Sequence, residues 1–260
     1  MSLTSAGQTE DAYRFDWGSE GLHAIGQDAA VIIIVDVLSF TSAVDVAVGR
    51  GGFVYPYPSG NDGAAEFAAS LGAELAVHRT AVNEISRWSL SPQTLSALPR
   101  GSRLVIPSIN GATLVHKAAA FGVPILAGCL RNATAVANRA ASLAAGRGSI
   151  AVIAAGERWY TNTGPLRPSA EDLLGAGAVL HALDPSAAVR QPCCSPEAAT
   201  ARAAFASARY RLVEQIARTA SGRELLTLGW AEDVGMSAAH DVSQVAPILR
   251  DGAFVDSALG

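Results

Sequence analysis

Residues 30–42 read AVIIIVDVLSFTS, and this stretch predicts both the fold class and the place of a candidate site. The apolar run over residues 31–35 favours a strand that is covered on both faces, as in a largely parallel sheet. Asp36 follows directly and would lie at the carboxyl end of that strand, where α/β proteins place their ligands. The hydroxyl residues after it can cap a helix whose first amides face the same crevice. The alternative is a buried carboxylate that only accepts hydrogen bonds from loop amides.

The rest of the chain repeats one theme, in which a short apolar strand, a turn with Gly, Asn or Ser, and an Ala-rich helix follow one another. Such alternation predicts an α/β fold, and we expect a layered α/β/α sandwich with a mainly parallel or mixed sheet. Residues 1–20 are polar and are expected to be an N-terminal lead-in, whereas residues 21–260 would form one catalytic domain. Residues 79–99 lose the pattern and are predicted as an ordered loop with a short helix, placed at the junction if the domain has two lobes.

Composition argues against several classes of partner. Half of the 260 residues are apolar, 16% are charged, the net charge is −4 and no basic block occurs. We therefore expect neither nucleic acid nor a membrane as the main partner. The odd number of cysteines, 3, and the lack of an apolar segment in the first 20 residues favour a cytoplasmic protein over a secreted, disulfide-stapled one. The sequence leaves a homodimer open.

Polar residues follow two further predicted strands. Asn110 and Gly111 lie where a strand passes into a helix, and a glycine there lets the backbone approach a phosphate closely. The alternative for this pair is a simple turn. Arg131 and Asn132 occupy the equivalent place after the next strand. An arginine there can bind an anion through two hydrogen bonds, although a solvated surface arginine is the default interpretation.

Two adjacent acids, Glu171 and Asp172, follow Ser169 at the predicted start of a helix over residues 170–183. Ser169 as N-cap with Asp172 three residues later fits a capping box, which accounts for Asp172 better than for Glu171. Together with Asp36, these carboxylates would suit a hard cation such as Mg²⁺, which takes oxygen ligands. The five histidines show no metal-ligand spacing, and no P-loop, G-x-S-x-G or G-x-G-x-x-G motif occurs. Spacing alone thus indicates Mg²⁺ and phosphate on an α/β sheet.

Several segments resemble, in the same order, motifs of the 2-phosphosulfolactate phosphatase family. They are VDVLSFTSA (35–43), PSINGATLV (107–115), AGCLRNATAVA (127–137), AVIAAGE (151–157) and SAEDLLGAGAV (169–179), and residues 225–249 resemble the family's C-terminal region. The resemblance covers nearly the whole chain from about residue 20. It implies a Mg²⁺-dependent phosphatase that hydrolyses a small anionic phosphate ester, 2-phosphosulfolactate, to sulfolactate and phosphate.

The resemblance also implies roles for individual residues. Asp36 would be central, either as a nucleophile or as a metal ligand. Glu171 and Asp172 would complete the Mg²⁺ shell, and one of them could act as a general base through water. The substrate and its phosphate would be bound by Asn110, Gly111, Arg79, Arg131 and Asn132.

The chain departs from the family's motifs at Ser39, where the family usually has an arginine, and within residues 89–93, where an acid is missing. The first change removes a candidate anion clamp. Two alternatives to the phosphatase therefore stay open. One is a family member that binds anions without turnover, and the other is a phosphotransferase or lyase that acts on a phosphorylated hydroxy acid.

Overall fold

The computed structural model describes residues 8–58, 63–160, 164–185 and 193–259. Its strands are β1 (Tyr13–Trp17), β2 (Ala29–Val35), β3 (Phe53–Pro58), β4 (Glu74–Leu75), β5 (Arg103–Ser108), β6 (Ile125–Gly128), β7 (Ser149–Ala154), β8 (Glu157–Arg158), β9 (Leu166–Arg167), β10 (Pro247–Arg250) and β11 (Ala253–Asp256). Nine of these described strands form one sheet in the order β1-β7-β2-β6-β10-β11-β3-β5-β4, and β8 pairs with β9 in a separate hairpin.

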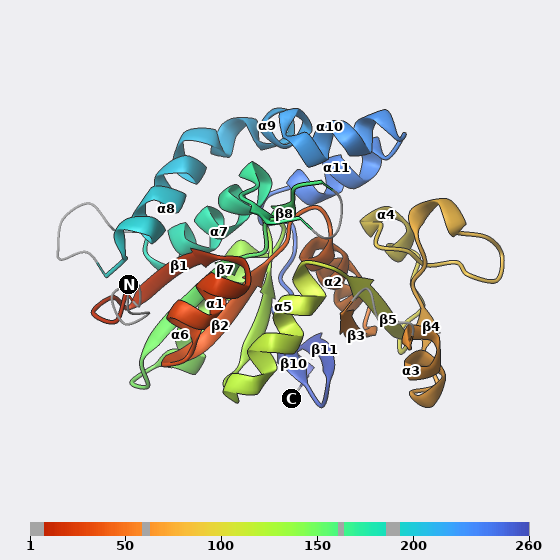
Figure 1. Ribbon diagram of the computed structural model, residues 1–260, viewed down its shortest axis with the longest axis horizontal. Helices are drawn as coiled ribbons and strands as arrows, with labels where there is room; N and C mark the ends of the chain where they lie inside the picture. The colour runs from red at the N-terminus through yellow and green to blue at the C-terminus, as the bar shows by residue number, and fades with distance from the viewer. Residues whose placement is uncertain (1–7, 59–62, 161–163, 186–192, 260) are drawn as a thin grey trace.

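Helices cover both faces of the large sheet (Figure 1). They are α1 (Gly18–Gly26), α2 (Phe40–Gly49), α3 (Ala64–Ser70), α4 (Pro92–Leu95), α5 (Gly111–Ala118), α6 (Ala133–Ala144), α7 (Ala170–Leu183), α8 (Pro196–Ala208), α9 (Leu212–Arg218), α10 (Ala220–Thr227) and α11 (Ala231–Ala238). One core contains side chains of α6, α7 and α8, and the core on the opposite face contains side chains of α1, α2 and α5. The predicted α/β sandwich is confirmed.

The strand β2 lies between β7 and β6, and its side chains from Val31 to Val35 are fully buried. Val31, Ile33 and Val35 belong to the core of α6, α7 and α8. Ile32 and Ile34 belong to the core on the other face. Alternate side chains of a strand point to opposite faces, so a strand inside a sandwich needs an apolar residue at every position. The apolar run therefore predicted the place of this strand correctly.

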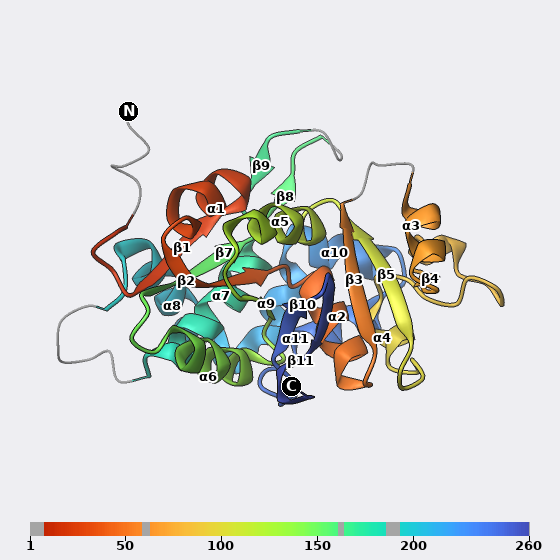
Figure 2. The same cartoon turned by 90° about the horizontal axis from the view of Figure 1, so that it is seen from below.

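The sheet is mixed because a C-terminal hairpin joins two parallel groups of strands. One group is β1, β7, β2 and β6, and the other is β3, β5 and β4. Between them, β10 pairs antiparallel with β6 at Ile248 and Leu126, while β11 pairs antiparallel with β3 at Phe254 and Val54. In Figure 2, β3 and β5 run across the direction of β2. Strand ends of both groups can thus reach one site.

The N-terminal region differs from its prediction. Residues 13–17 of the expected polar lead-in form β1, which pairs with β7 along its whole length. Phe15 is buried in the core, and Tyr13 and Trp17 pack against it. The alternation of Tyr13, Phe15 and Trp17 with polar residues is the period of a half-buried strand, and it was the signal for this edge of the sheet.

The chain after α7 forms a helical arm, α8 to α11, along one side of the molecule (Figure 1). Within the arm, α8 and α9 are separated by a 3₁₀ turn at Arg209–Arg211. The helix α4, which lies within the loop predicted over residues 79–99, packs against both α11 of the arm and α2. No helix within the described residues is long and apolar enough to cross a membrane.

Candidate active site

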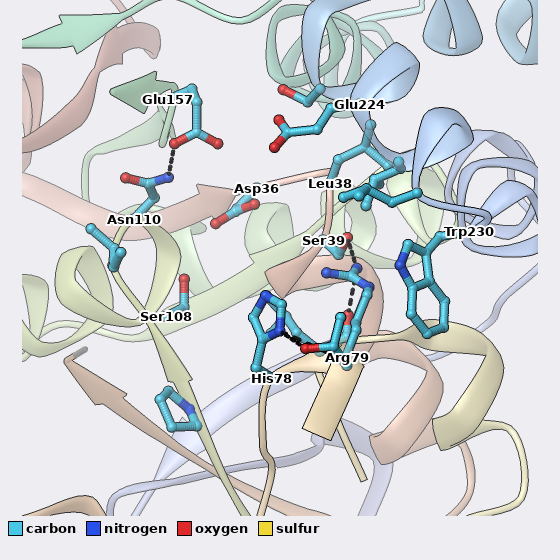
Figure 3. Close-up of a pocket in the computed structure, with 17 residues that line it drawn as sticks. Asp36, Leu38, Ser39, His78, Arg79, Ser108, Asn110, Glu157, Glu224 and Trp230 are labelled. Atoms are coloured by element: carbon cyan, nitrogen blue, oxygen red, sulfur yellow. Dashed lines mark hydrogen bonds between the residues drawn. The ribbon is translucent and has the colours of Figure 1, made fainter. Parts of the chain in front are cut away.

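A pocket of about 340 Å³ lies where the ends of β2 and β5 meet the helical arm (Figure 3). The strand ends contribute Asp36 and Asn110, and the turn after β7 contributes Glu157. The segment after β4 contributes His78 and Arg79. The arm contributes Ser221, Glu224, Leu225, Leu228 and Trp230. Acidic, basic and apolar side chains therefore share one hollow.

Asp36 is held by backbone amides at the start of two helices. Its Oδ2 accepts a hydrogen bond from Gly111 N at 2.9 Å, and its Oδ1 accepts one from Phe40 N at 3.3 Å. Burial, and next the charge of Glu157, raises the pKa of Asp36 to about 7, while the two hydrogen bonds act in the opposite direction. A carboxyl group with such a pKa in a pocket is a candidate catalytic or ligand-binding group.

Gly111 lets the backbone at the start of α5 approach Asp36 closely, whereas the sequence analysis expected it to approach a phosphate. A Cβ atom at this position would lie 2.3 Å from Phe40 Cδ1 and 2.7 Å from Asp36 Oδ2. The Gly111 amide donates to Asp36, so this contact does not support the phosphate-donor role, which stays a prediction. We assign the contact to the placement of Asp36.

Glu157 is a pocket residue that the sequence analysis did not select. Its Oε1 accepts hydrogen bonds from Asn110 Nδ2 at 2.9 Å and from Arg158 N at 3.0 Å. The preceding residue, Gly156, has φ +64°, and a Cβ there would lie 2.8 Å from a methyl group of Leu166. The glycine is therefore needed for the turn that brings Glu157 to the pocket. The available signal was an acid soon after an apolar strand, the same pattern that singled out Asp36.

Asp172 ties the ends of two strands to α7. Its Oδ1 accepts a hydrogen bond from Val37 N at 2.7 Å, and its Oδ2 accepts one from Gly156 N at 2.9 Å. Ser169 Oγ also donates to Oδ2 at 2.9 Å, whereas the Ser169 side chain makes no capping hydrogen bond to a helix amide. Burial, and next the charge of Asp36, raises the pKa of Asp172. The predicted capping box is thus replaced by contacts that place the residues next to Asp36 and Glu157.

Glu171 lies near the other two acids, and its negative charge raises the pKa of both Asp36 and Asp172. The residue is 3% exposed, and its Oε2 has no hydrogen-bond partner in the described part of the chain. The amide oxygen of Asn110 is likewise buried without a described partner. The structure therefore brings the three predicted acids together, but only Asp36 among them lines the pocket. Across the described residues, no three His, Cys, Asp or Glu side chains form a ready-made metal site.

Arg79 lines the pocket, and its guanidinium is held by a residue outside the pocket as well as by Ser39 and Leu90. Its Nε donates to Asp233 Oδ2 at 2.9 Å, and its Nη2 donates to Ser39 Oγ at 2.7 Å and to Leu90 O at 3.1 Å. Ser39 is the position at which the related motif usually carries an arginine. A guanidinium from another part of the chain therefore reaches the place that this change left without a cation.

Arg131 and Asn132 lie away from the pocket. Arg131 Nε donates to Asp45 Oδ2 at 2.8 Å, and its Nη1 donates to Met236 O at 2.8 Å. Asn132 is fully buried, and its Oδ1 accepts a hydrogen bond from Cys129 N at 2.9 Å. These contacts fix the turn after β6 and its packing on the arm. The substrate-binding roles predicted for Arg131 and Asn132 therefore do not fit the structure, and we leave both residues out of the candidate site.

The sequence model of the 2-phosphosulpholactate phosphatase family matches residues 20–252. The chain belongs to this family. The match includes the strands from β2 to β10, the arm and every pocket residue named above, whereas β1 and β11 lie outside it. A comparison with curated proteins finds no match. Membership of the 2-phosphosulpholactate phosphatase family indicates a phosphatase.

Proposed function

We propose that this protein is a Mg²⁺-dependent phosphatase that hydrolyses a small, acidic phosphate monoester, with 2-phosphosulfolactate as the first substrate to test. The observation that supports this most is the presence of Asp36 and Glu157 in the same pocket as Arg79 (Figure 3). Two carboxylates would repel a phosphate ester, so a site of this kind needs a cation between them and the ligand. Family membership supports the reaction class.

We propose Mg²⁺ as the ion because the pocket offers oxygen donors. Oxygen atoms are its preferred ligands, and it commonly uses one or two carboxylates while water and substrate phosphate complete its shell. Asp36 and Glu157 would hold the ion at the pocket, together with the amide oxygen of Asn110, which is buried without a described partner. Glu171, with its own partnerless oxygen, would add further negative charge. When bound, the ion would supply positive charge to the oxygens of the phosphoryl group.

Asp172 is not among the proposed Mg²⁺ ligands. Three hydrogen bonds already occupy its carboxylate, so we propose a positioning role for it rather than direct metal binding. It holds Val37 and Gly156, each of which is the chain neighbour of a proposed ligand. The arrangement thereby sets the separation of Asp36 and Glu157.

The remaining steps use side chains of the pocket. Arg79 would bind one anionic group of the ester through Nη1, which donates no hydrogen bond to a described residue. Glu157 would act either as a ligand or as the base that accepts a proton from the attacking water, because only its Oε1 is engaged, with Asn110 and Arg158 N. Asp36 would act either as a ligand or as the nucleophile, and both roles require the ionised form that a nearby cation favours.

Release of inorganic phosphate from 2-phosphosulfolactate and from p-nitrophenyl phosphate tests the proposal, with Mg²⁺ or with a chelator present. We expect turnover with Mg²⁺ and its loss with the chelator. In ¹⁸O-labelled water, hydrolysis by attack at phosphorus puts the label into phosphate. Absence of phosphate release from any small ester, with binding retained, would instead favour the anion-binding protein. Transfer of phosphate to an added alcohol, or elimination from the ester, would favour the phosphotransferase or the lyase.

A further inference from the structure

Asp233, on α11, is a fully buried carboxylate that accepts hydrogen bonds from residues 79–93, the segment that includes the pocket residue Arg79. Its Oδ2 accepts the hydrogen bond from Arg79 Nε at 2.9 Å. Its Oδ1 accepts hydrogen bonds from Ser91 Oγ at 2.6 Å and from Gln93 N at 3.1 Å. The side chain is 0% exposed. One carboxylate from the helical arm thus holds three donors that lie more than 130 residues earlier in the chain.

These contacts fix the direction of the Arg79 guanidinium. Nε is turned to Asp233 and Nη2 is turned to Ser39 and Leu90, so three of the five N–H groups are engaged. The two protons of Nη1 donate no hydrogen bond to a described residue. The guanidinium is planar and rigid, and hydrogen bonds hold its other two nitrogens in place. Figure 3 shows the guanidinium beside Ser39 in the pocket. A group held in this way loses little further freedom when it binds an anion.

A second buried pair provides the structural comparison. Arg131 and Asp45 are joined at 2.8 Å, with side chains 14% and 1% exposed, and Arg79 and Asp233 are joined at 2.9 Å, with side chains 14% and 0% exposed. The two pairs match in type, distance and burial. They differ in place, because Arg79 lines the pocket and Arg131 does not.

We propose that Asp233 is a positioning residue, which orients Arg79 so that its free guanidinium edge binds an anionic oxygen of the phosphate ester. The proposal deepens the proposed function and rests on it for the nature of the ligand. Asp233 touches neither the pocket nor the ligand, so its effect must pass through Arg79. It should therefore change the binding of anions more than the chemical step.

Asp233→Asn tests this role, with Asp45→Asn as its matched control. An asparagine keeps an oxygen that can accept from Ser91 and Gln93. Its amide nitrogen would then face Arg79 Nε, and because both groups only donate, the hydrogen bond that orients Arg79 would be lost. Inorganic phosphate, titrated by calorimetry in the presence of Mg²⁺, is the probe. We expect Asp233→Asn to weaken phosphate binding by roughly 10-fold to 100-fold, the range for one charge-assisted contact. We expect Asp45→Asn to change the phosphate Kd by less than about 2-fold, although it also disrupts a buried ion pair.

A double-mutant cycle separates positioning from a general loss of stability. In an Arg79→Ala background, Asp233→Asn should have no further effect on the phosphate Kd, because the group that it positions is gone. Arg79→Lys gives a second route if Asp233→Asn does not fold. A lysine can neutralise Asp233, but its single ammonium cannot also present a second edge to the pocket. We expect it to weaken phosphate binding about as much as Asp233→Asn does.

Parent-like phosphate binding in folded Asp233→Asn or in Arg79→Lys would overturn the proposal, and so would equal losses in Asp233→Asn and Asp45→Asn. Kinetics with p-nitrophenyl phosphate distinguish this result from a failure of the proposed function. If the parent binds phosphate but hydrolyses no ester, the phosphatase is refuted while the role of Asp233 is still decided by the Kd values. If the parent hydrolyses esters, Asp233→Asn should raise KM by about 10-fold or more and change kcat less.

Discussion

Gly111 N donates a 2.9 Å hydrogen bond to the carboxylate of Asp36, although 75 residues separate the two in the chain. The contact joins the start of α5 to the end of β2, and so it links the two parallel groups of the sheet. Those groups meet only because the C-terminal hairpin β10–β11 lies between β6 and β3. The candidate site is therefore built from residues that follow strands of both parallel groups.

Gly111→Ala is expected to damage both the site and the fold, because the new methyl group would press on Phe40 and Asp36. Overpacking of this kind costs about 1–3 kcal/mol of unfolding free energy. Denaturant unfolding and kcat/KM measure the two effects. Gly235→Ala is the control, since no atom lies within 4 Å of its Cβ position. That variant should be as stable as the parent or up to about 1 kcal/mol more stable. An active, stable Gly111→Ala protein would contradict the close approach.

Asp172→Asn should lower stability by about 1–3 kcal/mol, because an amide nitrogen would face Val37 N or Gly156 N and leave a buried donor unpaired. Turnover should fall with it, since both donors adjoin pocket acids. Ser169→Ala removes only the third hydrogen bond of this carboxylate and should cost about 0.5–1.5 kcal/mol. If the two variants lower the free energy of unfolding equally, the hydrogen bonds of Asp172 to Val37 N and Gly156 N do not contribute measurably to stability.

Glu157→Gln should lower kcat by about 100-fold or more if Glu157 takes a proton from water, because the amide cannot accept it. The melting temperature should stay near that of the parent, since an amide oxygen can still accept from Asn110 and Arg158 N. Glu66→Gln, at an exposed position on α3, controls for the change in net charge. Parent-like turnover in Glu157→Gln would remove this residue from the mechanism.

Binding of Mg²⁺ should depend on pH through Asp36. Burial raises the pKa of Asp36 from 3.8 to about 7, so the folded protein favours the protonated carboxyl group. The contribution of this group to folding stability is therefore full below about pH 4 and is lost as the pH rises through 7. Metal binding requires the ionised carboxylate. We therefore expect Mg²⁺ to raise the melting temperature more at about pH 8 than at about pH 5.5. Thermal unfolding with Mg²⁺ or with sodium chloride of equal ionic strength measures this. Equal Mg²⁺ effects at the two pH values would exclude Asp36 as a ligand that titrates near 7.

Local pattern was sufficient for the elements that carry Asp36 and the two acids of α7. Five buried apolar residues followed by Asp36 could only be a two-faced strand with an acid at its end, and α7 begins and ends as its sequence predicts. The same reasoning could have selected Glu157, which follows β7 in the same manner. It could not identify the hairpin β10–β11, because its short strands are placed by their partners β6 and β3.

The sequence by itself determined the alternation of strands and helices, the two buried faces of β2, the extent of α7 and the place of acids after strands, because these depend on periodicity and composition over a few residues. Only the tertiary structure decided which polar groups meet. The sequence assigned substrate binding to both Arg79 and Arg131, yet Arg79 lines the pocket and Arg131 pairs with Asp45. The partner of a buried charge is chosen by the packing of distant elements. Here the position of α11 places Asp233 behind Arg79, and no local pattern around either residue contains that information.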